Sequence, residues 1–377
     1  MQIYIVRPGD TIDLIAGNYG VTPAEISYAN QIPYPYQLAI GQAVLIPIEE
    51  GLENRRITTA SGYAYPFISK WVLQQTLPYL TNLMIFSYGF NTNGDVIAPF
   101  VDDTWMIAES NRYNVNPILV LTPFDKNGQF NNNLIHSMLQ NENAMDNLIS
   151  NLMDTVRTKG FKGVDVDFEY ILANDRDSFT GFVYELRTRM NEEGYTVSVA
   201  LAPKTSADQK GLLYEGKDYA GLGAAANEVL LMAYEWGYTY GPAMAVAPLN
   251  KVRQVVEYAL TEIPSQKINL GIPNYGYDWT LPYVRGESKA LTIGNVEAVQ
   301  IAIRNDVPIS FDEVAASPFI NYLLEEIKHE VWFEDARSMY AKFGLLNEYN
   351  LKGIGVWQIM RLFRAMWLIY ADMFYVL

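Results

Sequence analysis

Short apolar runs alternate with longer amphipathic stretches from about residue 58 to the end of the chain. The runs lie within residues 62–67, 82–90, 117–124, 163–170, 195–203, 228–236, 267–279 and 353–359. Each run is short enough to be a buried strand, and each intervening stretch is long enough to contain a helix that returns to the start of the next strand. Eight such units predict an α/β fold with a parallel (β/α)8 barrel, the TIM barrel.

The segment between the seventh and eighth predicted strands is longer than one helical return. Residues 283–333 contain the helical pattern ALTIGNVEAVQIAIRND and the short run EVWFED. We therefore expect a small α+β insertion within a barrel domain that spans residues 58–377. The apolar end of the chain, residues 360–377, is interrupted by charges and is too short to span a bilayer, so it predicts a packed amphipathic helix.

Residues 1–48 follow a different pattern, which predicts a small separate βααβ unit with strands at 2–6 and 43–46. Asp10 stands where the first helix needs an N-cap, and Gly20 closes that helix. The second helix begins with a capping threonine, a proline and a glutamate at residues 22–25. The polar residues at 49–57 predict a linker to the barrel.

Composition narrows the choice of partners. Half of the residues are hydrophobic, 18% are charged, and the net charge is −15, which opposes binding to a phosphate backbone. We therefore expect no nucleic-acid partner and no membrane partner, and a chain that acts as a monomer. The 27 tyrosines exceed what packing alone requires and suit recognition of sugars. The start of the chain shows no secretory signal pattern.

Several kinds of chemistry are excluded by residue counts. The chain has no cysteine, which excludes disulfides, thiolate catalysis and cysteine-based metal sites. Its two histidines, His136 and His329, are too few for a multi-histidine zinc site, and no GxSxG motif supports a serine triad. We expect neither a metal nor another cofactor.

One strand carries an unusual set of acids. In GVDVDFEY, residues 163–170, three carboxylates alternate with apolar residues, so a strand places all the acids on one face. Burying like charges is costly, which favours a functional site over a structural role. A calcium loop is the main alternative, but its sixth position requires glycine and here holds Tyr170. In a barrel, this strand delivers Glu169 to the carboxyl end, where catalysis takes place.

The acidic segment resembles the DxxDxDxE signature of family 18 glycoside hydrolases. The resemblance continues with MAYEWGY on the sixth strand, GIPNYGYDW on the seventh and Trp357 on the eighth. Two positions depart from the family pattern: the first acid of the signature is Lys162, and the usual MxYD ends in Glu235. Neither departure affects the last three acids.

The resemblance implies a mechanism in which the 2-acetamido group of the substrate acts as the nucleophile. Glu169 would be the general acid and then the base, and repulsion between like charges would keep it protonated near neutral pH. Asp167 would orient the acetamido N–H, Asp165 would hydrogen-bond Asp167, and Tyr234 would donate to the acetamido carbonyl. Trp357 is expected to form the floor of the pocket. Further expected substrate contacts are Trp236, Glu235 and Asn274, with Tyr63, Tyr65, Tyr275 and Tyr277 as weaker candidates.

The first 48 residues resemble a LysM module, with GDT, IA, N and GQAVLIP at the family positions. Such modules bind glycans that contain N-acetylglucosamine in a groove between two loops. The resemblance therefore implies two lips, one formed by Gly9, Asp10, Thr11 and Ile12 and the other by Asn30, Gln31, Ile32 and Pro33. Asp10 and Thr11 can also serve simply as helix caps.

Together these features predict a LysM-anchored glycosidase that cleaves a glycan containing N-acetylglucosamine. The pairing of domains, with TYGPAMAVAPLNKV after the sixth strand, most resembles bacterial spore cortex-lytic N-acetylglucosaminidases, which implies peptidoglycan as partner and a spore location. The alternatives are a chitinase, a catalytically silent glycan-binding protein and a coat protein held by LysM alone. The presence of Glu169 opposes the silent alternative.

Overall fold

The computed structural model describes residues 1–48, 55–124 and 129–377. The N-terminal unit consists of β1 (Gln2–Ile5), α1 (Ile12–Tyr19), α2 (Pro23–Asn30) and β2 (Ala43–Ile46), with the two strands paired antiparallel. The capping box of α2 joins Thr22 and Glu25 as expected, and Gly20 ends α1 in the left-handed region at φ 68°. The predicted βααβ unit is therefore present in this order.

The N-cap of α1 differs from the expectation. Thr11 is the capping residue, and its hydroxyl accepts a hydrogen bond from the Leu14 N–H. Asp10 instead accepts from the Tyr4 hydroxyl at 2.8 Å and from the Arg7 N–H at 2.7 Å. The carboxylate thus closes the turn ahead of the helix, because a threonine next to it already satisfies the first helical N–H groups.

Eight parallel strands form the barrel in chain order, and the eighth pairs with the first to close the ring. The predicted (β/α)8 fold is thereby confirmed, although the first strand begins earlier than expected and the acidic strand ends earlier. The strands are β3 (Arg56–Ala64), β4 (Asn82–Phe90), β6 (Asn116–Leu121), β7 (Gly163–Val166), β8 (Thr196–Leu201), β9 (Glu228–Leu231), β10 (Ile268–Pro273) and β16 (Gly353–Trp357).

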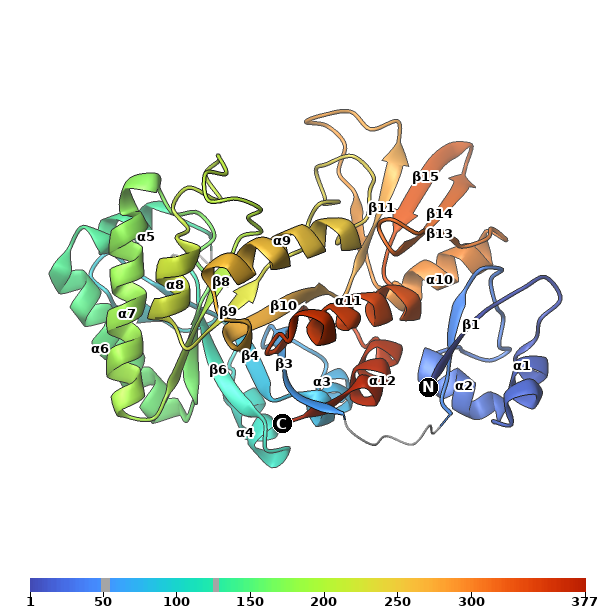
Figure 1. Cartoon of the computed structure of the whole chain (residues 1–377), viewed down its shortest axis with the longest axis horizontal. Coiled ribbons are helices and arrows are strands. Elements are labelled where there is room, and N and C mark those ends of the chain that lie inside the picture. The colour runs from blue at the N-terminus through green and yellow to red at the C-terminus, as the bar shows by residue number, and fades with distance from the viewer. Residues whose placement is uncertain (49–54, 125–128) are drawn as a thin grey trace.

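Helices surround the barrel, and the core lies between them and the strands (Figure 1). α6 (Glu142–Lys159) shows why they form: Asn141 caps its start, Gly160 ends it at φ 85°, and its buried apolar residues recur at helical spacing. The other helices around the barrel are α3 (Lys70–Thr76), α4 (Thr104–Arg112), α5 (Asn133–Leu139), α7 (Arg176–Glu192), α8 (Tyr219–Ala225), α9 (Leu249–Glu262), α11 (Ala336–Tyr349) and α12 (Arg364–Met373). Short 3-10 turns lie at Leu77–Tyr79, Ala173–Asp175 and Ser265–Lys267, and two short strands, β5 (Val96–Ile97) and β17 (Phe374–Val376), extend the sheet.

A five-stranded antiparallel sheet with one helix stands between β10 and β16. It contains β11 (Gly276–Leu281), β12 (Leu291–Ile293), α10 (Asn295–Arg304), β13 (Ser310–Asp312), β14 (Ser317–Leu324) and β15 (Ile327–Trp332). The single strand predicted at 267–279 is therefore two strands, and this lobe begins at Gly276 instead of residue 283. Gly276 permits the change of sheet, because a Cβ there would lie 2.3 Å from the carbonyl oxygen of Trp332.

The N-terminal unit packs against α10, α11 and α12 (Figure 1). Leu45 is fully buried in the core cluster of the barrel, and Ala39 lies in the core of the insertion. Backbone groups meet directly, because the Ile309 N–H donates to the Ile40 carbonyl oxygen at 2.8 Å. The terminal ammonium of Met1 pairs with Asp372 at 2.9 Å. The unit is therefore docked on the barrel. Of the predicted linker 49–57, residues 49–54 lie outside the described residues, and β3 begins at Arg56.

We expect deletion of residues 1–48 to destabilise the barrel. Uncovering the apolar surface beneath Leu45 and Ala39 costs about 2 kcal/mol or more, and each kcal/mol lowers the melting temperature by about 2 °C in a large domain. Calorimetry should therefore show a drop of about 4 °C or more, whereas the exposed α1 substitution Asp13→Ala should leave the temperature unchanged. Equal melting temperatures for the full chain and the truncated chain would show that the docking contacts add nothing.

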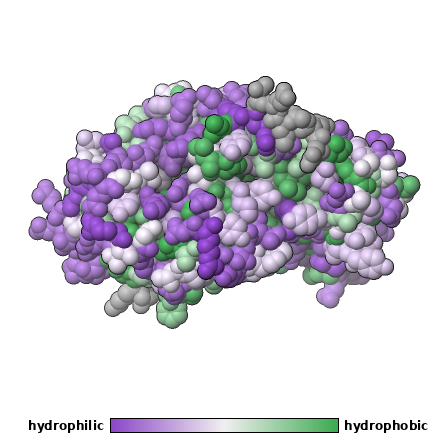
Figure 2. All heavy atoms as spheres, turned by 90° about the horizontal axis from the view of Figure 1, so that it is seen from below, coloured by the Kyte–Doolittle hydropathy of each residue, from purple (hydrophilic) through white to green (hydrophobic). Residues whose placement is uncertain are grey.

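The surface agrees with the acidic composition. On the face shown in Figure 2, hydrophilic residues cover most of the surface and hydrophobic residues show in separate patches. Within the described ranges, no helix combines the length and the apolar character that crossing a membrane requires.

Candidate active site

Asp165 of β7 and the two acids that follow this strand face the inside of the barrel, because their apolar neighbours are held outside it. Val164, Val166 and Phe168 are fully buried in the layer between the strands and the helices. The Phe168 ring stacks on Phe179 and Phe182 of α7, with centroids 5.8 and 6.1 Å apart. This anchor fixes the backbone on both sides of Phe168. The alternation predicted from sequence is confirmed, and the last two acids lie just beyond the carboxyl end of the strand.

Asp165 is fully buried and accepts two hydrogen bonds. The Tyr63 hydroxyl donates to it at 2.9 Å and the Ser198 hydroxyl at 2.5 Å. Burial raises the pKa of Asp165 to about 6, and these two donors oppose the rise. Among the described residues no hydrogen bond joins Asp165 to Asp167, so the expected bond between them is absent. Asp165 instead ties β7 to β3 and β8.

Asp167 has an unpaired oxygen. Its carboxylate is almost completely buried, and Oδ1 has no hydrogen-bond partner within the described structure. Burial raises the pKa of Asp167 well above its usual value, and the charges of Glu169 and Asp165 raise it further. A buried acceptor without a donor is costly unless a ligand supplies the donor. Asp167 is therefore suited to receive an N–H from a substrate.

Glu169 is the most accessible of the three acids, because its side chain is only half-buried. Its pKa is raised, and burial is the larger cause. The expectation from sequence named repulsion between like charges as the cause, but in the structure that repulsion acts mainly on Asp167. Asp167 and Glu169 therefore titrate as a coupled pair, and the pair retains one proton at a pH above the usual pKa range of carboxyl groups.

The segment after β9 brings a phenol and a carboxylate beside these acids. Burial raises the pKa of Tyr234 well above its usual value, and the Asp167 and Glu169 charges raise it further, so its hydroxyl remains a donor. Gly271 makes room for this ring, since a Cβ there would lie 2.7 Å from it. Glu235 has φ 69°, a strained conformation for a residue with a side chain. It accepts from the hydroxyls of Tyr275 and Tyr277.

Trp357, at the end of β16, forms one side of an aromatic cluster. Its ring lies 5.0 Å from Phe86, 5.9 Å from Tyr63 and 6.1 Å from Tyr65, measured between centroids. Three of the predicted aromatic residues, Trp357, Tyr63 and Tyr65, therefore lie together with Phe86. Tyr275 and Tyr277 belong to a neighbouring cluster, against which Trp357 also packs. Trp236 is half-buried and packs against the main core, and its backbone N–H donates to the Val246 carbonyl oxygen at 3.0 Å.

Asn274 has a different position from the one expected. Its amide donates to the carbonyl oxygens of Gln358 and Arg361 at 3.0 and 2.9 Å, and its Oδ1 accepts from Asn295. Only 3% of the residue is exposed. Asn274 therefore holds the chain after β16 in place, and all of its polar side-chain atoms are bonded within the protein.

Residues 127–361, more than half of the chain, match the profile of glycosyl hydrolases family 18. The chain belongs to this family. It is 36% identical to a cortical fragment-lytic enzyme of Bacillus subtilis strain 168, over 99% of the chain and 98% of that relative. The crystal structure of the Bacillus megaterium QM B1551 spore cortex-lytic enzyme SleL has a TM-score of 0.93 at 34% identity, over 100% of this chain and 98% of that one. The structure of a chitinase from Chromobacterium violaceum, 23% identical with a TM-score of 0.76, shares the fold and covers 84% of this chain and 98% of that one.

The family 18 hydrolase also carries a LysM domain, because residues 4–47 match that profile. The residues expected on its two lips have mixed environments. Gly9, Thr11 and Pro33 are exposed and Asp10 is half-buried, whereas Ile12 and Ile32 lie in the core of the unit. The Asn30 side chain bonds the backbone of Ile26 and Leu45.

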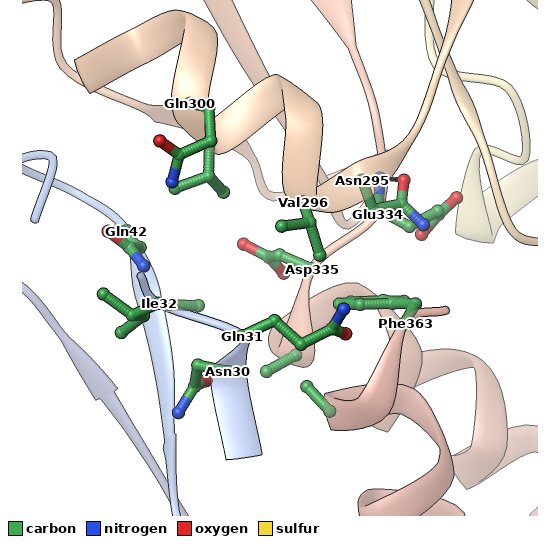
Figure 3. A pocket seen from close by; sticks show the side chains of 14 residues that line it. Asn30, Gln31, Ile32, Gln42, Asn295, Val296, Gln300, Glu334, Asp335 and Phe363 are labelled. Atoms are coloured by element: carbon green, nitrogen blue, oxygen red, sulfur yellow. Dashed lines mark hydrogen bonds between the residues drawn. The ribbon is translucent and has the colours of Figure 1, made fainter. Parts of the chain in front are cut away.

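Gln31 faces the barrel of the family 18 hydrolase. Its side-chain oxygen Oε1 accepts from the backbone N–H of Arg364 at 2.7 Å, and the Arg364 guanidinium lies 3.9 Å from the centre of the Tyr28 ring. Figure 3 shows Gln31 reaching toward Phe363 in a pocket between the LysM unit, α10 and the segment before α11. The second predicted lip, residues 30–33, therefore takes part in docking the LysM unit on the barrel. Its resemblance to a LysM module gives no sign of this contact.

Proposed function

We propose that this glycoside hydrolase cleaves glycosidic bonds of N-acetylglucosamine in spore cortex peptidoglycan, with retention of configuration. The observation that carries the proposal is the set of acids at the carboxyl end of β7, in which Asp167 keeps a buried, unpaired oxygen. The full-length similarity to proteins named cortical fragment-lytic and spore cortex-lytic enzymes supports the choice of substrate. The same similarity supports a location in the spore.

In the proposed reaction, Glu169 donates its proton to the glycosidic oxygen as the bond between this oxygen and C1 breaks. The carbonyl oxygen of the 2-acetamido group attacks C1 from the other face and forms an oxazolinium ion. Asp167 accepts the acetamido N–H, and Tyr234 donates to the acetamido oxygen. Glu169, now ionised, takes a proton from the water that attacks C1, while the bond between C1 and the acetamido oxygen breaks and the acetamido group is regenerated. Two successive displacements at C1 give a product with the configuration of the substrate.

The surrounding residues support these roles. Because burial raises the pKa of Glu169, the proton needed for the first step is retained at higher pH than on an exposed glutamate. Asp165 is fixed by Tyr63 and Ser198 and contributes charge behind Asp167. The aromatic cluster around Trp357 offers a flat apolar surface to a sugar ring.

The LysM unit is proposed to bind the same glycan through its exposed lip, Gly9 to Thr11, together with Pro33. Because the unit is docked on the barrel, a bound strand would have a fixed direction relative to the active site. This arrangement would raise the local concentration of the enzyme on a polymer that offers many sites.

The proposal is tested by digesting purified cortex, vegetative peptidoglycan and chitin in parallel. We expect cortex to be cleaved fastest, with new reducing ends that are N-acetylglucosamine when the products are reduced with borohydride and identified by mass spectrometry. New reducing ends on muramic acid would assign the other bond of the polymer. Faster digestion of chitin would favour the alternative function as a chitinase, and binding without any product would leave only a glycan-binding role.

A further inference from the structure

A buried lysine lies behind the acidic segment. Lys217, in the segment between β8 and α8, is fully buried. Its ammonium donates to the carbonyl oxygen of Phe168 and, at 3.1 Å, to that of Ala200 in β8. Phe168 stands between Asp167 and Glu169 in the chain, so the ammonium lies against the backbone that carries both acids.

The approach of this segment is enforced by its neighbours. A Cβ on Gly216 would lie 2.3 Å from the Ile171 carbonyl oxygen, so only glycine lets the chain run this close to the acidic segment. The Lys217 ammonium also lies 5.2 Å from the centre of the Phe179 ring of α7. Its own carbonyl oxygen accepts from Lys204, and its N–H donates to Tyr214. Contacts from three directions thus fix the lysine.

Such a lysine is costly for stability alone. A buried ammonium loses several kcal/mol of hydration unless it is paired, yet no carboxylate of the described structure lies within 4.0 Å of this one. Its charge is therefore not cancelled by a direct ion pair, and it acts on all three acids at longer range.

We propose that Lys217 is a positioning residue that holds the Asp167–Glu169 segment against β8 and supplies the positive charge that sets how the acid cluster shares its proton. This inference rests on the roles proposed for Asp167 and Glu169. It goes beyond them, because Lys217 faces the backbone and does not contact substrate.

The electrostatics agree with the geometry. Lys217 lowers the pKa of each of the three acids against the upward effect of burial, and their charges in turn raise the pKa of Lys217, which burial brings down to about 8. The lysine is therefore charged at neutral pH. The other titratable groups around the three acids are Glu228, Tyr63, Tyr65, Tyr170, Tyr234 and Glu235. The charged groups around the lysine's segment include Lys204, Arg176, Asp208, Asp218 and Glu262.

The test is the pH dependence of kcat/KM for Lys217→Met on soluble cortex fragments. Loss of the positive charge raises the pKa of the carboxyl that must be ionised and of the one that must be protonated. The acidic limb of the profile of kcat/KM against pH reports the carboxyl that must be ionised, and the alkaline limb reports the one that must be protonated. Both limbs should therefore move to higher pH, by about 1 unit. Lys267→Met is the matched control, because the Lys267 ammonium is also held by two backbone carbonyl oxygens, those of Gly223 and Ala226, and none of the three acids is among the charges that shift its pKa. The control should keep the wild-type limbs.

A second experiment separates charge from packing and does not depend on the folding of the methionine variant. The chain has no cysteine, so Lys217→Cys can be alkylated at a single site while unfolded and then refolded. Bromoethylamine restores an ammonium, whereas bromopropane gives an uncharged side chain of similar length. We expect only the charged adduct to restore the wild-type limbs. Superimposable limbs for the two adducts, or for Lys217→Met and the wild type, would overturn the inference. Failure of the proposed function itself would appear separately, as a wild-type enzyme without activity on cortex.

Discussion

Replacing Glu169 with glutamine is expected to abolish hydrolysis while leaving glycan binding nearly intact. The amide has the shape of the carboxyl group but cannot donate a proton to the leaving oxygen or accept one from water. General acid and base catalysis by one group is typically worth about 10³-fold, so kcat should fall by roughly this factor, or about 4 kcal/mol of barrier. Reducing ends released from cortex fragments under saturating substrate measure this directly.

Binding and folding must be shown to survive in the same variant. Calorimetric titration with a reaction product should give similar affinities for Glu169→Gln and the wild type. Glu193→Gln is the matched control, because Glu193 follows the far end of α7 and pairs on the surface with Arg157. That variant should keep full activity. If Glu169→Gln keeps more than about a tenth of wild-type kcat, or about 1.4 kcal/mol of barrier, Glu169 is not the acid.

The sequence predicts the part of the site that lies on a single strand, β7, and on the residues directly after it. Val164, Val166 and Phe168 alternate with the acids, and this period of two is enough to place the acids on the inner face. The barrel itself follows from the repeated alternation of strand and helix. The inward-facing acids and the barrel fold both follow from local patterns, so they can be predicted without knowing which strands are neighbours.

The partners of the acids come from elsewhere in the chain, and their signals are weak. Ser198 is a small polar residue between two valines of β8, and only the register that pairs it with Asp165 gives it a role. Lys217 lies in a polar segment that resembles any exposed loop, although it is fully buried. Asn274 shows the opposite error, since its motif suggested substrate contact and its bonds are internal. Residue type alone does not distinguish these cases.

The docking of the N-terminal unit was also beyond reach of the sequence. Separate domain patterns and polar residues between them predict two independent bodies, and this is the usual meaning of such a linker. Leu45 and Ala39 read as core residues of the small unit, but they pack into the barrel and the insertion. An apolar residue does not reveal which core it joins, so only the structure shows that the two parts are packed together.

Asp167 carries the second large effect that we expect. Its Oδ1 is buried and without a partner, which is the position an acetamido N–H would fill if the substrate supplies its own nucleophile. Asparagine can place its amide oxygen there but has no charge to stabilise the oxazolinium ion, so Asp167→Asn should lower kcat by about 10² to 10³, in the range known for loss of electrostatic stabilisation. Asp165→Asn should have a smaller effect, because both oxygens of Asp165 are already bonded by Tyr63 and Ser198 and the residue lies within β7, whereas Asp167 lies beyond its carboxyl end.

The same argument predicts how the wild-type enzyme responds to a stable mimic of the intermediate. A thiazoline analogue of N-acetylglucosamine keeps the fused ring of the oxazolinium ion, and its ring nitrogen carries the matching N–H when it is protonated. It should therefore inhibit more strongly than the product does, and Asp167→Asn should lose most of this preference. Substrates without the 2-acetamido group should not be cleaved by either protein. Proton NMR at early times should show a product with the configuration of the substrate. An inverted product, or equal inhibition of both proteins by the thiazoline, would mean that water attacks C1 directly and that the unpaired oxygen of Asp167 has another purpose.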